Sequence, residues 1–449
     1  MLNKPWMKQS VLSVTAMSML LAGCAASQGT DSSSPQASSS DKPVTIKLHT
    51  WNNLKTDGFD VVIQEFEKKY PNIKVEFVSQ GDNNSTEAMK KVDLAAASGE
   101  SLDVIMIQNR AAYAQRIALN MFEPLDEYMS KEGIQFDNEY KVDTKLNGKY
   151  YGIPGKSVSW FVVINENHLK EAGLPVPKDW TWDEFLDYAK KMTKLDGGAK
   201  HYGTHFHTWT VPYTNLGQYN RQENSNLVTD DLKSANVMNP VMRKSLEIRK
   251  QAEKDQSATP YAEVISQKMN YRPQYFNQAA SMLATGTFLI AETGGTDAVP
   301  ANFKTVFAPY PKLNKEDPIA SPFEGDILAV YGKSKHKQEA YTFIRWFTTE
   351  GITLQGRYIP SWKKANLDEV IDKIVSKTKT PEQVDKESLL YVLKNTTTSK
   401  SATPIPYQAE VEKVMQEEFD KMLLKDQDID TTQKNAQERI QKLIDANKK

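Results

Sequence analysis

The stretches VTIKLHTWN, at residues 44–52, and DVIMIQN, at residues 103–109, bracket a regular pattern of apolar residues. Apolar and polar side chains alternate in the first stretch, which predicts a strand, and residues 73–77 repeat the alternation. Residues 59–70 and 84–98 each place apolar side chains on one helical face, which predicts two helices. The unbroken run VIMI is typical of a strand buried on both faces of a parallel sheet. This order of elements predicts an α/β fold with a doubly wound sheet.

Helices are also predicted in later parts of the chain. Thr181 and Glu184 have the spacing of a capping box, which marks the start of a helix. Residues 340–347 carry an apolar helical face, and we expect Gly351 to end that helix. Three tryptophans near these helices are expected to pack in the core: Trp180, Trp182 and Trp346.

The composition is that of an ordinary globular protein. The 449 residues are 39% hydrophobic and 25% charged, which excludes a multi-pass membrane protein, a collagen-like fibre and a wholly disordered chain. The length allows two or three domains. A net charge of −1 argues against a nucleic-acid partner, because neutralising phosphates requires a basic face. The single cysteine excludes an intramolecular disulfide.

That cysteine belongs to a targeting segment. An apolar run at residues 11–22 follows two lysines and ends in LAGC, where Cys24 has the position of the lipidated cysteine in a bacterial lipobox. The resemblance implies that residues 1–23 are a lipoprotein signal peptide and that Cys24 carries the lipid. Residues 24–43 are rich in serine and are predicted to be a tether. We therefore expect a cell-membrane protein, lipid-anchored on the extracytoplasmic face.

Several segments follow one another in an order that is known from one family. They are VTIKLHTWN at 44–52, FEKKYPNIKVEF at 66–77, LAAASGESLDVIMIQN at 94–109, YYGIP at 150–154, GLPVPKDWTWDEF at 173–185 and SKHKQEAYTFIRWF at 334–347. Together they resemble family 1 of the extracellular solute-binding proteins. These are the sugar receptors of bacterial ABC importers, and maltose-binding protein is among them.

The resemblance implies a two-lobed periplasmic-binding-protein-like fold of type II, with lobes joined by crossing hinge segments. The N-lobe would comprise residues 44–123 plus 303–358, and the C-lobe residues 124–302 plus 359–449. The chain would cross between lobes near 122–125, 300–303 and 358–361. A carbohydrate would bind in the cleft between the lobes without a cofactor, and we expect it to be an oligosaccharide. Hinge closure would then present the complex to the ABC permease transmembrane subunits. Members of the family are usually monomers, so we expect a monomer.

Sugar recognition requires two kinds of side chain. Flat aromatic rings contact the C–H faces of a sugar, and planar polar groups bind its hydroxyls. In open α/β sheets such ligands bind beyond the carboxyl ends of the strands. With the resemblance, these criteria select Trp51, Trp160, Trp209 and Trp362 for stacking. For hydroxyl recognition they select Asn52, Gln108, Asn109, Glu292, Glu324 and Asp326.

Other functions remain as alternatives. His201, His205 and His207 are close in sequence, but a structural zinc site usually has four ligands, so we predict no metal there. A phosphorylated polyol would need a cationic site, for which Arg110 or Arg221 is available. A secreted glycosidase would need two carboxylates that flank one bond, and no motif marks such a pair. A structural lipoprotein is the last alternative. We expect a receptor and not an enzyme.

Overall fold

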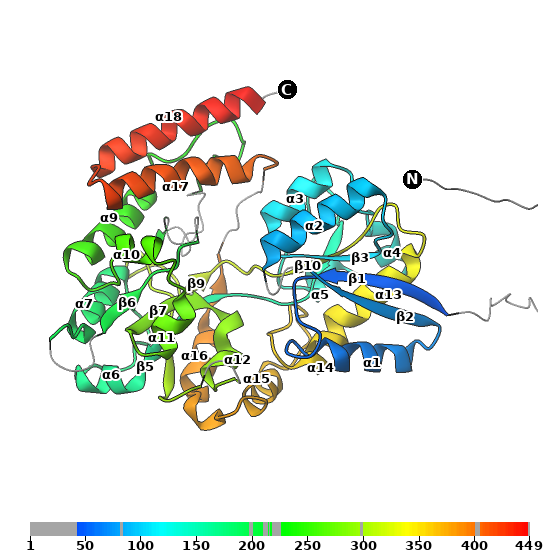
Figure 1. The fold of residues 1–449 in the computed structure, drawn as a ribbon, viewed down its shortest axis with the longest axis horizontal. Coiled ribbons are helices and arrows are strands. Elements are labelled where there is room, and N and C mark those ends of the chain that lie inside the picture. Colours follow the sequence, from blue (N-terminus) through cyan, green and yellow to red (C-terminus); the bar gives the residue numbers. More distant parts are fainter. Residues whose placement is uncertain are drawn as a thin grey trace, which may run out of the picture. The chain divides into compact units, whose positions relative to one another are not determined.

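The computed structural model describes residues 43–80, 84–196, 201–209, 214, 216–217, 226–296, 300–399 and 405–447 (Figure 1). The predicted signal peptide, Cys24 and most of the tether lie outside the described residues, and so does Arg221. None of the described helices combines the length and the apolar character needed to cross a bilayer.

The helices and strands are given below in chain order, in three consecutive stretches. The first stretch is β1 (Val44–Thr50), α1 (Phe59–Lys69), β2 (Ile73–Ser79), α2 (Ser85–Ser98), β3 (Val104–Ile107), α3 (Arg110–Ala118), α4 (Asp126–Lys131), α5 (Phe136–Glu139) and β4 (Gly152–Pro154). The second is β5 (Trp160–Asn165), α6 (Glu166–Glu171), α7 (Trp182–Met192), β6 (Tyr202–His205), α9 (Pro240–Lys254), α10 (Tyr261–Ser266), α11 (Tyr271–Phe276), β7 (Ala280–Gly286), η2 (Thr287–Leu289), α12 (Ile290–Thr293) and β8 (Thr305–Pro309). The third is β9 (Ala320–Ser321), β10 (Ile327–Val330), α13 (Lys337–Trp346), η3 (Phe347–Gly351), α14 (Ile352–Gln355), α15 (Leu367–Ser376), η4 (Pro381–Gln383), α16 (Lys386–Asn395), β11 (Thr397–Thr398), α17 (Gln408–Leu424) and α18 (Ile429–Asn447).

The first sheet has the strand order β2-β1-β3-β10-β4. Strands β2, β1 and β3 are parallel, with α1 and α2 as their connections, which confirms the βαβαβ unit predicted from the sequence. Strand β10 enters from much later in the chain and pairs antiparallel with both β3 and β4. Consequently the sheet combines one continuous segment with two strands that the chain adds later.

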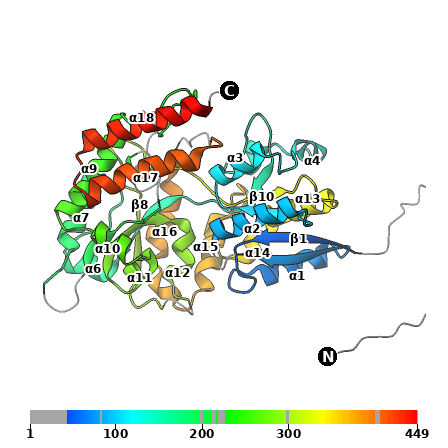
Figure 2. The ribbon, with the colours of Figure 1, turned by 45° about the horizontal axis from the view of Figure 1, so that its top comes forward.

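Helices cover both faces of the first sheet (Figures 1 and 2). Val104 and Met106 of β3 belong to a core that includes residues of α1 and α13. Ile105 and Ile107 belong to a second core that includes residues of α2 and α3. Successive side chains of a strand point to opposite faces, so the unbroken run VIMI supplies both cores. This is the doubly wound arrangement predicted from the sequence.

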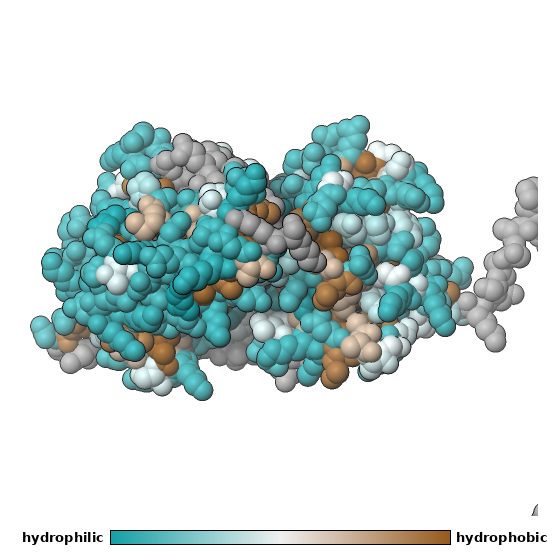
Figure 3. Space-filling model, turned by 90° about the horizontal axis from the view of Figure 1, so that it is seen from above, coloured by the Kyte–Doolittle hydropathy of each residue, from teal (hydrophilic) through white to brown (hydrophobic). Residues whose placement is uncertain are grey.

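The second sheet has the strand order β6-β7-β5-β8, with β5 antiparallel to both of its neighbours. Its largest core contains Trp180 and Trp182, and Trp346 lies in a core of the first sheet, so all three tryptophans are core residues as predicted. The face of the molecule in Figure 3 is mainly hydrophilic, and its apolar side chains form small separate groups. A further core joins α17 and α18 to α9 and α10.

The helix ends follow their sequence signals with one exception. The Thr181 hydroxyl accepts from Glu184 N–H and the Glu184 carboxylate accepts from Thr181 N–H, so the predicted capping box is confirmed. The prediction that Gly351 ends its helix is wrong. Gly351 keeps helical angles at the end of a π-helical turn, and the chain continues into α14. Gly356 ends α14 instead, with φ at 59°, a left-handed conformation that glycine adopts without strain.

Three segments connect the two sheets, and we call them the crossing segments: residues 155–159, 322–326 and 357–361. Gly155 N–H donates to Asp326 O at 2.9 Å, and Ser157 N–H donates to Ile359 O at 2.7 Å. Val158 exchanges two hydrogen bonds with Glu324, so the first segment is bonded to both of the others.

Sheet membership corrects two of the predicted boundaries. Strand β4 lies in the first sheet because it pairs with β10, so the chain does not leave that sheet near 122–125. Strand β8 lies in the second sheet because it pairs with β5, so the chain does not return near 300–303. Both corrections come from pairings between strands that are far apart in sequence, which local patterns do not specify.

Candidate functional site

One edge of the first sheet collects polar side chains from several strands. Ile327, the first residue of β10, lies opposite both Ile107 at the end of β3 and Pro154 at the end of β4. Because β1 is parallel to β3, its carboxyl end meets the same edge. The residues that follow or precede these strand ends at this edge are Asn52, Gln108, Lys156 and Asp326.

A pocket lies at this edge. Asn52, Lys156, Asp326, Gln355 and Tyr358 supply its polar wall, and its apolar wall consists of Phe59, Met106, Leu328, Phe347 and Ile352. The space that these side chains enclose is about 10 Å³, which is room for about one water molecule. An oligosaccharide would therefore lie mainly on the surfaces around this pocket and reach into it with a single hydroxyl group.

The charged wall of the pocket is an ion pair buried beneath an aromatic ring. Lys156 Nζ lies 2.7 Å from Asp326 Oδ2 and 4.5 Å from the centre of the Tyr358 ring. Burial alone would lower the pKa of Lys156, but attraction to Asp326 and Tyr358 outweighs it, and the pKa is raised. Lys156 therefore stays charged at neutral pH. Sequence reasoning selected Asp326 but missed Lys156 and Tyr358. The signal for Lys156 was a single lysine between apolar neighbours in YGIPGKSVSW.

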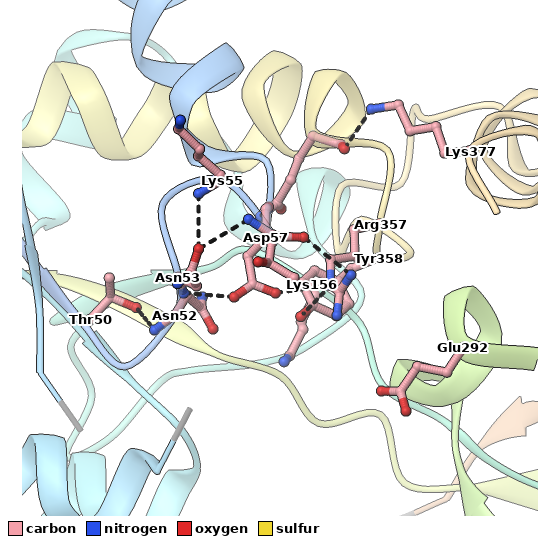
Figure 4. A network of polar contacts seen from close by, with 12 residues as sticks. Thr50, Asn52, Asn53, Lys55, Asp57, Lys156, Glu292, Arg357, Tyr358 and Lys377 are labelled. Atoms are coloured by element: carbon pink, nitrogen blue, oxygen red, sulfur yellow. Dashed lines mark hydrogen bonds and ion pairs between the residues drawn. The ribbon is translucent and has the colours of Figure 1, made fainter. Parts of the chain in front are cut away.

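A second polar network adjoins the pocket (Figure 4). Asp57, which is 3% exposed, accepts a hydrogen bond from Asn53 N–H at 2.7 Å and pairs with Arg357 Nε at 3.0 Å. Arg357 Nε also donates to the Tyr358 hydroxyl at 3.1 Å. Burial would lower the pKa of Arg357, but Tyr358 and Asp57 raise it. This network fixes the loop after β1 against the third crossing segment.

A second ion pair joins α11 and α12, the helices on either side of β7 in the sequence. Arg272 donates to both carboxylate oxygens of Glu292, at 2.7 and 2.9 Å, and its guanidinium lies 4.7 Å from the centre of the Tyr271 ring. Glu292 is one of the predicted residues. In Figure 4 its carboxylate points toward the side where Arg357 and Tyr358 lie. The Glu292 charge contributes to raising the pKa of Arg357, so the two networks interact electrostatically.

Aromatic side chains gather beside Arg272. The Trp209 ring is 44% exposed, and its centre lies 4.5 Å from His207, 5.6 Å from Tyr271 and 5.8 Å from Phe288. Trp160 is 3% exposed and meets Trp209 edge to face at 6.4 Å. Of the four tryptophans predicted to stack on a sugar, Trp209 exposes its ring, and Trp160 supports it from the core. We call this group the aromatic platform.

The remaining predicted tryptophans have structural partners. Trp51 is 8% exposed and belongs to a core of the first sheet. Trp362 packs partly buried against the same core, and its Nε1–H donates to Glu139 at 2.9 Å. Neither is among the residues that line the pocket. A tryptophan after a strand is thus a weak signal, because packing decides whether its ring reaches solvent.

The predicted polar residues also separate into groups. Asn109 caps α3 by accepting from Ala112 N–H at 2.8 Å, which accounts for its side chain. Gln108 Oε1 is buried without a hydrogen-bond partner among the described residues. Burial and the charge of Glu412 raise the pKa of Glu324, whereas Arg110 acts in the opposite direction. Asp326 and Glu292 lie in the ion pairs described above, and Asn52 lines the pocket.

Among the described residues, no group of three or more potential metal ligands gathers at the histidine segment. His201 instead stacks on His168, with ring centres 3.8 Å apart. Burial lowers the pKa of His207 well below its usual range, so this ring is neutral at pH 7 and packs against Trp209 and Tyr271.

Comparisons with known proteins identify the family and the fold of the chain. Residues 52–354 match the family of bacterial extracellular solute-binding proteins. The multiple sugar-binding protein of Streptococcus mutans is 24% identical over 349 residues, which cover 74% of this chain and 76% of that protein. An ABC substrate-binding protein from Listeria monocytogenes, solved with cycloalternan, superposes with a TM-score of 0.72 at 20% identity, covering 90% of this chain and 98% of that one. UgpB from Mycobacterium tuberculosis, solved with glycerophosphocholine, superposes with a TM-score of 0.70 at 18% identity, covering 90% of this chain and 99% of that one. The fold is therefore that of the two-lobed periplasmic binding proteins, and the chain belongs to the bacterial extracellular solute-binding protein family.

Proposed function

We propose that this protein is the lipid-anchored, extracytoplasmic receptor of an ABC importer. It captures a carbohydrate, in the first instance an oligosaccharide, between its two lobes and delivers it to the membrane permease. The family consists of binding proteins, and a relative that spans three quarters of the chain is a sugar-binding protein. The proposal assigns no catalytic step and no cofactor to the chain.

The observation that carries the proposal is the aromatic platform beside two polar networks. Trp209, which is 44% exposed, offers an aromatic ring for the C–H surface of a sugar. Asn52, Asp326 and Glu292 offer planar acceptors and donors for its hydroxyl groups. The pocket at the edge of the first sheet receives one hydroxyl group of the ligand, and the platform supports the rest.

The charges of the site favour a neutral ligand over a phosphorylated polyol. A phosphate group needs cations whose charge is not already neutralised. Lys156 is paired with Asp326, Arg272 with Glu292, and Arg357 with Asp57. A phosphate at any of these cations would lie close to a buried carboxylate, whose negative charge opposes its binding. Neutral hydroxyl groups can bind to the same ion pairs without breaking them.

Removal of the exposed ring should weaken sugar binding. We expect Trp209→Ala to lose about 1–3 kcal/mol of binding free energy, because the apolar area of the ring no longer covers the sugar. Titration calorimetry with the best sugar measures this loss as a higher Kd. Trp362→Ala is the matched control, because its ring is partly buried and does not line the pocket, and its Kd should equal that of the parent. Unchanged binding in Trp209→Ala would remove the platform from the site.

The identity of the ligand is tested on the chain from residue 25 with a panel of monosaccharides, oligosaccharides and glycerol phosphates. A specific ligand at a hundredfold excess over its Kd stabilises the folded state by about 2.7 kcal/mol, which raises the melting temperature. Stabilisation by one sugar family, with the sugar recovered intact, supports the proposal. Stabilisation by the phosphate esters alone would favour the polyol alternative, and hydrolysed product would favour the glycosidase.

The proposed anchor has its own test. Cys24→Ser should move the protein from the membrane fraction of producing cells into the medium, because a chain without acyl groups has no attachment there. Immunoblots of the two fractions measure the redistribution, and labelling with a palmitate analogue should disappear in the variant. A variant that stays in the membrane fraction and keeps the label would overturn the assignment of the anchor.

A further inference from the structure

We propose that Lys156 is a positioning residue, which couples occupation of the pocket to the relative placement of the three crossing segments. The inference deepens the proposed function and rests on it where ligand affinity is concerned. Its structural basis is independent of the ligand, because it concerns how one buried ammonium joins segments from three distant parts of the chain.

The ammonium contacts both of the other crossing segments from the first one. Its ion pair with Asp326, at 2.7 Å, reaches the last residue of the second crossing segment. Its position 4.5 Å from the centre of the Tyr358 ring reaches the third. The backbone repeats this connection, since Gly155 N–H donates to Asp326 O and Ser361 N–H donates to Gly155 O at 2.8 Å.

Because of these contacts, intermediate placements of the crossing segments are unfavourable. The Lys156 and Asp326 side chains are 15% and 10% exposed, so a shift that separates them would leave two charges largely buried and unpaired. An unpaired buried charge is strongly unfavourable. Small rotations between the lobes therefore either preserve the whole arrangement or exchange it for a different one, as two-state hinges require.

The same side chains line the pocket, which links this arrangement to the ligand. Lys156, Asp326 and Tyr358 all belong to its wall. A ligand hydroxyl that bonds to the Asp326 carboxylate shares the group that holds Lys156. The ligand thus binds one placement of the crossing segments more tightly than others, and such differential affinity is what shifts a conformational equilibrium.

The test compares three variants with a matched control. Lys156→Met keeps an unbranched side chain one atom shorter and removes its charge, Lys156→Arg keeps the charge, and Asp326→Asn removes the partner charge. The control is Lys312→Met, because Lys312 is 5% exposed and also pairs with an aspartate, Asp179, at 2.7 Å. It lies outside the pocket and the crossing segments.

Two readouts are measured on the full chain in a Cys24→Ser background. The first is the Kd for the best sugar. The second is the distance distribution between spin labels at Leu94→Cys on α2 and Met238→Cys, whose parent side chains are 70% and 56% exposed. A residue that only stabilises the fold would change the melting temperature and leave both readouts as in the parent.

For Lys156→Met we expect at least a tenfold rise in Kd, a shifted or broader distance distribution without ligand, and a smaller change on adding sugar. Asp326→Asn should act in the same direction, and Lys156→Arg should lie closer to the parent. Lys312→Met should change neither readout. The proposal is overturned if Lys156→Met and Asp326→Asn both keep the parental Kd and distances, or if Lys312→Met changes them equally. If Lys156→Met does not fold, Asp326→Asn and Lys156→Arg are compared instead, and the same criteria for Kd and distances apply.

The distances without ligand separate this inference from the proposed function. If the parent binds no sugar while Lys156→Met changes the ligand-free distances, the positioning role stands and the sugar receptor does not. If sugars bind with equal affinity to parent and variant and the distances agree, the receptor stands and the positioning role is lost.

Discussion

Gly325→Ala should lower the free energy of unfolding by about 3 kcal/mol or more and abolish high-affinity ligand binding. A Cβ added at this position would lie 1.9 Å from the backbone oxygen of Lys156, a distance that no real Cβ contact reaches. The obstacle is backbone, so no side-chain rotation relieves it. The second crossing segment must move away from the first, and the hydrogen bonds between Val158 and Glu324 are stretched. Urea denaturation measures the loss of stability and titration calorimetry measures the loss of affinity.

Gly332→Ala is the control for this substitution. A Cβ there would meet its nearest atom at 3.5 Å, which is ordinary van der Waals contact. The variant should unfold within about 1 kcal/mol of the parent and bind ligand normally. Equal behaviour of the two variants would mean that the crossing segments can separate without cost, which contradicts their description as a tightly bonded unit.

Glu418→Gln should destabilise the protein by about 2 kcal/mol at pH 7. Burial alone would raise the pKa of Glu418, but hydrogen bonds from Lys421, Gln427 and Arg439 outweigh it and lower the pKa from 4.5 to about 2. The whole shift corresponds to about 3 kcal/mol. Lys421 and Arg439 are 41% and 37% exposed, so we expect water to screen part of this energy.

The pH dependence of this effect has a definite sign. A carboxyl whose pKa is lowered by folding stabilises the protein above its unfolded pKa, and this contribution is lost as pH falls through the folded value. The difference in unfolding free energy between parent and Glu418→Gln should be constant above about pH 5 and shrink between about pH 5 and pH 2. Glu417→Gln is the control, since Glu417 pairs with the same Arg439 but is 42% exposed. Equal losses in both variants would refute the role of burial.

The parts of the fold that the sequence predicted are those whose signals are local. Alternation in residues 44–50 and the unbroken run at 104–107 identify strands without knowledge of their partners. The capping box of Thr181 and Glu184 likewise spans only four consecutive residues. The insertion of β10 between β3 and β4 has no local signal, because it depends on pairing across more than 170 residues. The pairing of β4 with β10 and that of β8 with β5 are both long-range, and they are the pairings that correct the two predicted boundaries.

The residues of the candidate site divide in the same way, into those with a local sequence signal and those without one. Asn52 and Asp326 were predicted because they adjoin strand ends, and strand ends are visible in the sequence. Trp51 adjoins a strand end as well, yet its ring is buried in a core. Asp57, Arg357 and Tyr358 were missed because nothing in their own segments indicates that a β1 loop and a late crossing segment meet. Exposure and long-range pairing, which decide these cases, are properties of the assembled fold.

The position of β10 has a consequence for how the protein comes to be folded during its production. Residue 327 leaves the ribosome long after β3 and β4, so for most of synthesis these two strands lack the strand that belongs between them. Unpaired strand edges keep a nascent chain from reaching its final state and expose it to unwanted partners. For a protein of an extracytoplasmic family, we expect this delay to favour export, because the first sheet cannot be completed before residue 327 is made.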